Sequence, residues 1–412
     1  MKRSLIIALS LFMSLILAWS CAGAAISKEE FEILSSFSNS LPENAETVDA
    51  SVSAVSSAPE TSAKAVCLME KSTKKVLYAQ NEKEKLYPAS VTKIMTLLLV
   101  CESIDSGKIS LKDTVTASGE ASAKGGSQIW LKPGETMTVD ELLKAAAVYS
   151  ANDACTALGE HVSGSETAFV NLMNARAKEL GMNDTHFENC TGLDDSTTEH
   201  LTTAYDIALM SAELLKHDII KNYSTIWMDT LRDGQTQLVN TNKLVRFYKG
   251  CTGLKTGTTS KAGCCVSASA QRDGMELIAV VLGSSNSNDR FSSARNMLDW
   301  GFANYEIYTP EFDKNAVHPI KVNRGAEDYV SPIVPVPEPI LINKGESENI
   351  KVGISLSDSV DAPVEKGAKL GSLTVTLSDK TLSSYDITAE KDVGVLTFSL
   401  AFKRILRSFA KK

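Results

Sequence analysis

The sequence predicts an α/β catalytic domain, followed by a small β domain and a C-terminal amphipathic helix. Strand-like segments begin the catalytic region and return at its end, with helical patterns between them and a closing helix over 290–302. Strands at both ends of a helical region indicate an antiparallel sheet flanked by helices, with a helical lobe inserted. The expected strands cover 65–69, 75–80, 254–259, 263–270 and 276–282.

Length and composition describe a globular protein with more than one domain. The chain has 412 residues, of which 43% are hydrophobic and 22% are charged. The net charge of −8 argues against nucleic acid as a partner. The five histidines include no His-Glu-x-x-His pattern and the eight cysteines no Cys-x-x-Cys pair. We therefore expect neither a metal nor a cofactor, and mostly buried free thiols.

Residues 1–24 have the pattern of a secretory signal. Lys2 and Arg3 precede an apolar segment, and Ala22-Gly23-Ala24 fits a cleavage site. An uncleaved anchor is an alternative, although about 15 apolar residues are short for a span of roughly 20. Cys21 allows a lipoprotein, which the bulky Trp19 disfavours. We expect secretion across the cytoplasmic membrane, with 25–61 as a flexible spacer.

Besides an apolar helix that begins near Ser90, four helices are expected between the two groups of strands. Thr138 and Glu141 form a capping-box pattern that opens the first of them. Gly181 fits the end of the third helix. Asp206, near the start of the fourth, is expected to be structural rather than catalytic. The four helices are predicted over 138–148, 152–161, 167–180 and 202–216.

The composition changes near Tyr308, which marks the end of the catalytic domain at 62–308. Alternating segments such as 349–354 and 373–377 predict a small β domain over 318–390. The tail, 393–412, has an aromatic and aliphatic helical face opposite a basic face. Such a helix suits the surface of an anionic membrane and is too short to span it. The alternative is a helix docked on its own domain.

The central motif is Ser90-Val-Thr-Lys93, at the start of an apolar helical pattern that follows Pro88. Residues three apart share a helix face, so the Ser90 hydroxyl and the Lys93 amine can meet. Serine becomes a good nucleophile when a base takes its proton, and lysine is such a base only when it is neutral. The apolar residues around Lys93 suit burial, which lowers a lysine pKa.

Two further motifs follow in a characteristic order. Ser150-Ala-Asn152 lies between two predicted helices, and Lys255-Thr-Gly257 lies on a predicted strand. The first two motifs also occur elsewhere, as Ser72-x-x-Lys75 in a predicted turn and as Ser284-x-Asn286. The order and context of the three motifs together are typical of active-site serine enzymes that recognise penicillins.

The chain resembles the serine-type D-alanyl-D-alanine carboxypeptidases, which are low-molecular-weight penicillin-binding proteins. The resemblance extends over about 62–390 and includes the stretches 126–134, 174–182, 203–206 and 299–302. It implies a transpeptidase/β-lactamase-like catalytic domain followed by the small β domain. It also implies peptidoglycan stem peptides as substrates, β-lactam antibiotics as inhibitors, and an extracytoplasmic enzyme attached peripherally to the membrane by its tail.

The resemblance and the chemistry together assign the catalytic roles. Ser90 attacks the carbonyl between the last two D-alanines, and neutral Lys93 accepts its proton. Ser150 relays a proton toward the leaving amine. The backbone N–H groups of Ser90 and Thr258 would form the oxyanion hole.

The substrate-binding residues follow from the same resemblance. Asn152 would hold a backbone amide of the substrate. Lys255 and the hydroxyls of Thr256 and Thr258 would bind its terminal carboxylate. Lys255 would also lower the Lys93 pKa as a second cation. Gly257 lets the substrate approach the strand closely. Thr258 stands where some relatives carry histidine.

Several other functions compete with this interpretation. A β-lactamase shares the fold and motifs, but no glutamate between Asn152 and Lys255 has an asparagine three residues later. A D,D-endopeptidase of the same fold remains open. A catalytically idle wall-binding protein would have little reason to keep all the motif residues. A Ser-His-Asp hydrolase would carry Gly-x-Ser-x-Gly, which does not occur.

Overall fold

The structure is a computed structural model that describes residues 57–410, with side chains described through Arg404. The expected signal segment, 1–24, and most of the expected spacer, 25–61, lie outside the described residues. The first strand begins at Ala65.

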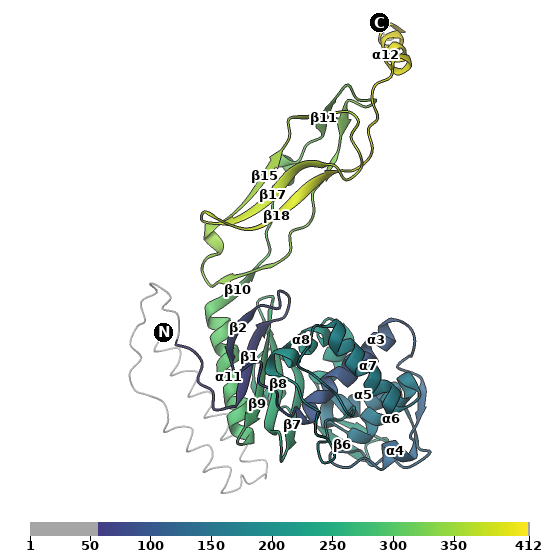
Figure 1. The fold of residues 1–412 in the computed structure, drawn as a ribbon, viewed down its shortest axis with the longest axis vertical. Helices are drawn as coiled ribbons and strands as arrows, with labels where there is room; N and C mark the ends of the chain where they lie inside the picture. The colour runs from purple at the N-terminus through teal and green to yellow at the C-terminus, as the bar shows by residue number, and fades with distance from the viewer. Residues whose placement is uncertain (1–56, 411–412) are drawn as a thin grey trace, which may run out of the picture. The chain divides into compact units, whose positions relative to one another are not determined.

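The catalytic domain is built on a five-stranded antiparallel sheet with strand order β2-β1-β9-β8-β7 (Figure 1). β1 pairs with β9 from the far end of the domain, so that the two edge strands, β2 and β7, are distant in sequence, as predicted. β1 and nearly all of β9 are buried, as their apolar sequences require. The strands are β1 (Ala65–Glu70), β2 (Val76–Gln80), β7 (Cys251–Thr259), β8 (Gly263–Arg272) and β9 (Met275–Ser284).

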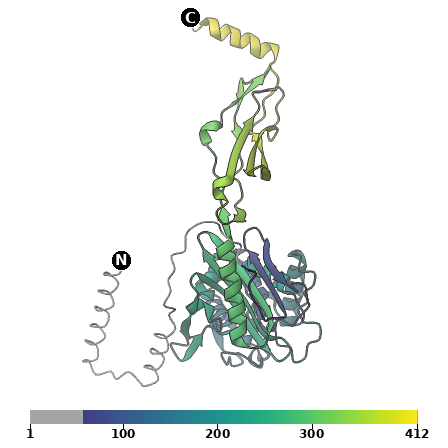
Figure 2. The ribbon, with the colours of Figure 1, turned by 90° about the vertical axis from the view of Figure 1, so that its left-hand side faces the viewer.

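Helices cover both faces of this sheet. α11 (Ser287–Asn304) lies across one face, and Phe291, Met297 and Leu298 pack there against β8 and β9 (Figure 2). The helical lobe covers the other face with a larger core. Its helices are η2 (Ala89–Thr92), α3 (Lys93–Asp105), α4 (Gly119–Ser122), α5 (Val139–Lys144), η3 (Ala145–Tyr149), α6 (Asn152–Ser163), α7 (Glu166–Glu179), α8 (Ala204–Leu214), η4 (Asp218–Ile220) and α9 (Lys221–Ser224). The short helix α10 (Leu244–Phe247) lies on the α11 side, where Leu244 shares a core with Phe291.

The predicted helix over 138–148 is divided in the structure. Its capping box forms, because Thr138 Oγ1 accepts from Glu141 N and Glu141 Oε2 accepts from Thr138 N. The last turn, η3, is a π-helix, and it ends at Ser150 in the left-handed conformation with φ 67°. A π-turn of this kind is frequent at functional sites. Here it reverses the chain so that Ser150 lies between two helices.

Two small two-stranded antiparallel sheets border the helical lobe. In one, β3 (Thr114–Thr116) pairs with β4 (Thr136–Thr138) across a connection that contains α4, and in the other, β5 (Met228–Leu231) and β6 (Thr236–Val239) form a hairpin. The β5–β6 turn has positive φ at Arg232, Asp233 and Gly234.

The C-terminal region is β-rich, as expected. β10 (Tyr305–Tyr308) pairs with β14 (Ile340–Asn343), and the sheet β13-β18-β17-β15 encloses a small core with Leu373, Val375 and Ile387. A second sheet has the order β12-β11-β16. The remaining elements are β11 (Ile320–Asn323), η5 (Lys314–Ala316), β12 (Tyr329–Val330), β13 (Pro332–Ile333), η6 (Ser347–Asn349), β15 (Ile350–Leu356), β16 (Ser359–Asp361), β17 (Lys369–Leu377) and β18 (Lys380–Ala389).

The tail forms α12 (Phe398–Ala410). Residues before it still pair with the β domain, since Val393 bridges Val364 and Leu396 N donates to Arg324 O. Phe398 is 86% exposed and Phe402 53% exposed. Within the described chain, no helix combines the length and apolar character needed to cross a membrane.

Candidate active site

Ser90 and Lys93 lie at the junction of η2 and α3. Ala89 has a positive φ of 49°, a sparsely populated conformation that turns the chain sharply into η2. Lys93 Nζ lies 2.9 Å from Ser90 Oγ. Lys93 is fully buried and Ser90 is partly exposed, so the hydroxyl can be reached from solvent while the amine cannot.

A loop of the helical lobe completes the surroundings of Lys93. The carbonyl oxygen of Thr191 accepts a hydrogen bond from Lys93 Nζ at 2.6 Å. Gly192 allows this approach, because a Cβ at that position would lie 1.9 Å from the Ala89 carbonyl oxygen. Asn189 Oδ1 accepts from the N–H groups of Thr191 and Gly192 and fixes the loop.

Burial lowers the pKa of Lys93 below its ordinary value of 10.5. The cause is desolvation, since removing water disfavours the charged amine. The surrounding Cys155, Cys190 and Asp153 act in the opposite direction. Lys93 is therefore set up to be neutral at a lower pH than an exposed lysine, which is the state required of a general base.

Ser150 and Asn152 are placed by the chain reversal after η3. Ser150 Oγ is buried and has no hydrogen-bond partner within residues 57–404. Asn152 Nδ2 donates to Gly125 O at 2.6 Å, and its backbone N–H donates to Ser127 O at 2.7 Å. Asn152 Oδ1 is buried and has no partner among the described side chains. The amide oxygen is thus available to accept from a ligand.

Lys255 lies on β7, the sheet edge beside η2. Its Nζ is buried and has no hydrogen-bond partner in the described part of the chain. Burial, followed by repulsion from Lys93, lowers the Lys255 pKa to about 7. This repulsion shows that the two amines lie near each other. We expected Lys255 to lower the Lys93 pKa, but burial is what lowers the pKa of Lys93, and the repulsion acts on Lys255 instead.

The remaining residues of the β7 motif contact the Ser90 segment and the strand's own neighbours. A Cβ on Gly257 would lie 2.7 Å from Ser90 N, so glycine permits the close approach of β7 to η2. Thr256 Oγ1 donates to Thr241 Oγ1 at 2.8 Å. Thr258 Oγ1 donates to Gly257 O at 2.8 Å.

Sequence reasoning missed three groups that support the site. Arg290 of α11 donates through Nη1 to Thr258 Oγ1 at 2.9 Å and to Gly257 O at 3.0 Å. The buried Asp153 accepts from Ile129 N and Leu131 N of the loop between α4 and β4, and Thr191 supplies the carbonyl described above. Asp153 could have been noticed beside Asn152, whereas nothing in the local sequence marks Arg290 or Thr191.

Asp206 has a structural position. Its carboxylate accepts hydrogen bonds from Asp184 N at 3.1 Å and from Thr185 Oγ1 at 2.7 Å. It thereby fixes a loop to the start of α8.

Comparison with known proteins identifies the class and then the family. Residues 52–286 match the family model described as D-alanyl-D-alanine carboxypeptidase, and 305–395 match the model described as penicillin-binding protein 5, C-terminal domain. The chain is 42% identical over 354 residues to D-alanyl-D-alanine carboxypeptidase DacF of Bacillus subtilis, covering 85% of this chain and 90% of that protein.

Solved structures agree with the sequence relatives. Penicillin-binding protein 5 from Haemophilus influenzae superposes with a TM-score of 0.71 at 30% identity, covering 82% of this chain and 99% of that one. Ampicillin-bound penicillin-binding protein D2 from Listeria monocytogenes gives a TM-score of 0.54 at 30% identity, covering 59% of this chain and 98% of that one.

The sheet, the helical lobe and the serine–lysine pair therefore define a serine enzyme with the fold of the penicillin-binding proteins. The chain belongs to the D-alanyl-D-alanine carboxypeptidase family. It is an enzyme of that class, with a β-rich C-terminal domain of the penicillin-binding protein 5 type.

Substitution of Gly257 tests the contact between β7 and η2. In Gly257→Ala the new Cβ would meet Ser90 N at 2.7 Å and Pro88 O at 2.9 Å. Displacing the serine by about 1 Å can cost about a hundred-fold in rate, so we expect at least about a ten-fold fall in D-alanine release from a peptide ending in D-Ala-D-Ala. Gly119→Ala is the matched control, since a Cβ there meets nothing within 4 Å. Equal rates for the two variants would contradict this account.

Proposed function

We propose that this carboxypeptidase removes the terminal D-alanine from peptidoglycan stem peptides through an acyl-enzyme on Ser90. The observation that carries the proposal is the set of buried polar atoms without partners beside the Ser90–Lys93 pair, namely Ser150 Oγ, Asn152 Oδ1 and Lys255 Nζ. Buried polar atoms in folded proteins nearly always have hydrogen-bond partners. Ser150 and Asn152 belong to the segment that joins η3 to α6, and Lys255 belongs to β7, so two distant parts of the chain present atoms suited to receive a substrate.

In the acylation step Ser90 Oγ attacks the carbonyl carbon between the last two D-alanines. Its proton passes to the neutral amine of Lys93, which lies 2.9 Å away. The negative charge on the carbonyl oxygen is stabilised by the backbone N–H groups of Ser90 and Thr258, at about 3 kcal/mol for each donor. As the carbon–nitrogen bond breaks, the proton held by Lys93 passes through the Ser150 hydroxyl to the leaving amine, which returns Lys93 to its neutral form. Water then hydrolyses the ester and regenerates the Ser90 hydroxyl.

The substrate is held on both sides of the bond that breaks. Protonated Lys255 binds the terminal carboxylate, aided by the hydroxyls of Thr256 and Thr258. The hydrogen bond from Arg290 Nη1 orients the Thr258 hydroxyl. On the other side, Asn152 accepts from a backbone amide of the peptide. Gly257, which we expected to admit the substrate backbone, instead lets β7 approach the nucleophile, since a Cβ there would lie 2.7 Å from Ser90 N.

β-Lactams fit the same site because they resemble the terminal dipeptide. We propose that they acylate Ser90 and leave slowly. The ampicillin-bound structure of the Listeria monocytogenes protein supports this proposal.

The proposed location is outside the cytoplasmic membrane, with the tail on its surface. The substrate of this family, the basic face of 393–412 and the secretory pattern of 1–24 support it. On the described part of α12, Phe398 and Phe402 are exposed, and Arg404 pairs with Asp328 of the β domain at 2.8 Å. One basic residue is thus engaged with the protein itself.

Loss of the nucleophile gives the most direct test of the proposed function. Ser90→Ala should abolish covalent labelling by a fluorescent penicillin and the release of D-alanine, because no acyl-enzyme can form. Ser72→Ala is the matched control, since Ser72 also stands in a Ser-x-x-Lys sequence but bonds Glu70 in the β1–β2 turn. Persistent labelling of Ser90→Ala would remove Ser90 as the nucleophile.

The two lysines predict a bell-shaped dependence of acylation on pH. Because the Lys93 pKa lies below 10.5, its neutral fraction grows as pH rises and the rate should increase. Lys255 must stay protonated to bind a carboxylate, and its pKa of about 7 makes the rate fall as pH rises through about 7. In Lys255→Arg the cation persists to higher pH, so the falling limb should move upward. An unmoved falling limb in penicillin-acylation rates would contradict the role of Lys255.

Removal of 398–412 tests membrane attachment without disturbing the pairing of 393–396 with the β domain. The truncated protein should lose binding to vesicles that contain anionic lipid, as measured by flotation, and keep its D-alanine release. Neutral vesicles are the control for the electrostatic contribution. Unchanged flotation of the truncated protein would exclude this helix as the attachment.

A further inference from the structure

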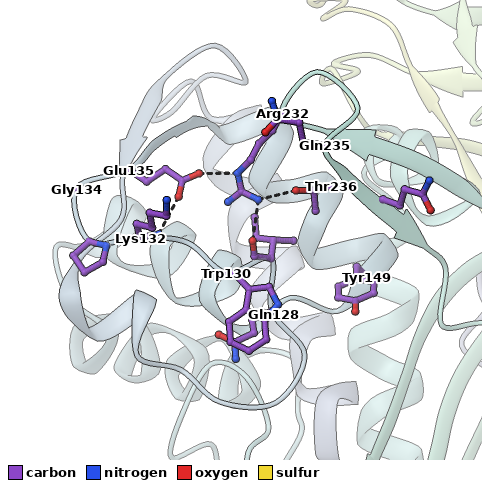
Figure 3. Close-up of a pocket in the computed structure, with 12 residues that line it drawn as sticks. Gln128, Trp130, Lys132, Gly134, Glu135, Tyr149, Arg232, Gln235 and Thr236 are labelled. Carbon is purple, nitrogen blue, oxygen red and sulfur yellow. Dashed lines mark hydrogen bonds and ion pairs between the residues drawn. The ribbon is translucent and has the colours of Figure 1, made fainter.

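A polar pocket lies beside the wall that carries Ser150 and Asn152, and the proposed reaction does not use it. It has a volume of about 850 Å³, within the range of ligand sites. Its residues come from three segments: the loop between α4 and β4, the end of η3, and the β5–β6 hairpin (Figure 3). We call it the Trp130 pocket. The residues that matter below are Gln128, Trp130, Tyr149, Arg232, Gln235 and Gln237.

Trp130 is held in the pocket wall with its indole in solvent. The side chain is 74% exposed, and the backbone has a positive φ of 60°, which is unusual for a bulky residue. The buried carboxylate of Asp153 accepts from Ile129 N and Leu131 N, on either side of Trp130. Burying an aromatic side chain of this size is worth about 1.5–3 kcal/mol, so a fixed exposed indole forgoes that stabilisation. Such strained and exposed positions point to a contact with a ligand.

The two main walls of the pocket are joined by Arg232. Its Nη1 donates to Ile129 O of the loop at 2.9 Å and to Thr236 Oγ1 of the hairpin at 2.9 Å. Its Nε pairs with Glu135 at 2.8 Å. Figure 3 shows the guanidinium reaching across between these partners. The pocket is therefore formed before any ligand binds, which lowers the entropic cost of binding.

The chemistry of the lining indicates a ligand rich in hydroxyl and amide groups. Arg232 pairs with Glu135, Lys132 adds one exposed ammonium group, and Gln128, Gln235 and Gln237 offer both donors and acceptors. The face of the Trp130 indole carries partial negative charge and attracts the C–H groups of a flat, apolar surface. A sugar ring combines a face of C–H groups with hydroxyls and an acetamido group at its edge.

We propose that the Trp130 pocket binds an N-acetylated sugar of the glycan strand from which the stem peptide extends. This inference rests on the proposed function, because it requires a stem peptide at Ser90. Asn152, the proposed partner of the peptide amide, bonds Gly125 O and Ser127 O of the same loop that presents Trp130. The peptide upstream of the scissile bond then leaves along this loop toward the pocket. Extended peptide covers about 3.3–3.6 Å per residue, so three residues reach about 10 Å beyond the site.

The test compares two substrates on the full chain. One is a disaccharide carrying a pentapeptide that ends in D-Ala-D-Ala, and the other is the same pentapeptide without sugar. Trp130→Ala should lower kcat/KM for the sugar-bearing substrate about ten-fold and change it less than about two-fold for the bare peptide. Trp130→Phe keeps an aromatic face and should therefore retain most of the wild-type kcat/KM for the sugar-bearing substrate. Phe247→Ala removes another exposed aromatic residue outside the pocket and should affect neither substrate.

The outcomes separate this inference from the proposed function. If the wild-type protein releases D-alanine from neither substrate, the proposed function fails. If it acts on both but Trp130→Ala lowers both rates equally, or lowers neither, the sugar site is wrong and the carboxypeptidase stands. A second readout is the quenching of tryptophan fluorescence by a peptide-free tetrasaccharide of the glycan, which should be present in wild type and lost in Trp130→Phe. Quenching by the bare peptide and not by the tetrasaccharide would overturn the assignment to sugar.

Discussion

The contact between Lys93 Nζ and Ser90 Oγ is the constraint on which the rest of the site depends. For this contact to produce a base, the Lys93 amine must be shielded from water. The fold provides the shielding by placing Lys93 on the first turn of a helix that is buried nearly all round. The sheet edge at β7 and the Thr191 loop close over it from two sides, each through a glycine that allows close backbone approach. Helix, strand and loop therefore have to fold together before the serine becomes a nucleophile.

Charge placement follows from the same packing. Lys93 and Lys255 are both buried and lie close enough to repel each other, so their pKa values cannot both stay at that of an exposed lysine. A bound carboxylate would stabilise the charge on Lys255 while Lys93 stays neutral. Arg290, which is also largely buried, holds β7 from behind and leaves the Lys255 amine free for a ligand.

The sequence predicted those parts of the protein whose cause is local. The apolar residues around Lys93 and the capping box at Thr138 each specify an element that the structure contains. The order of three short motifs, together with a family resemblance, indicated one site. The π-turn before Ser150 was not predictable, because it depends on how the chain packs beyond that helix.

Contacts made by distant parts of the chain were also out of reach of sequence reasoning. In the sequence, nothing distinguishes Arg290 from other arginines on predicted helices. It reaches Gly257 and Thr258 only because α11 packs on the sheet. Thr191 contributes a backbone carbonyl to the site, and the identity of a side chain does not predict such a backbone contact. Asp153 links the two halves of the substrate region, since its neighbour Asn152 faces the reaction while its own carboxylate fixes the loop around Trp130.

The cysteines described in the structure are all free, and most are buried. Burial raises the pKa of Cys67 to about 12 and that of Cys155 to about 11, so almost none of either thiol is present as the reactive thiolate. The fold of residues 57–404 is therefore not stabilised by any disulfide bond. A preparation kept under reducing agent throughout should give the same folded enzyme. Neither an oxidising refolding step nor a disulfide isomerase is needed to obtain it.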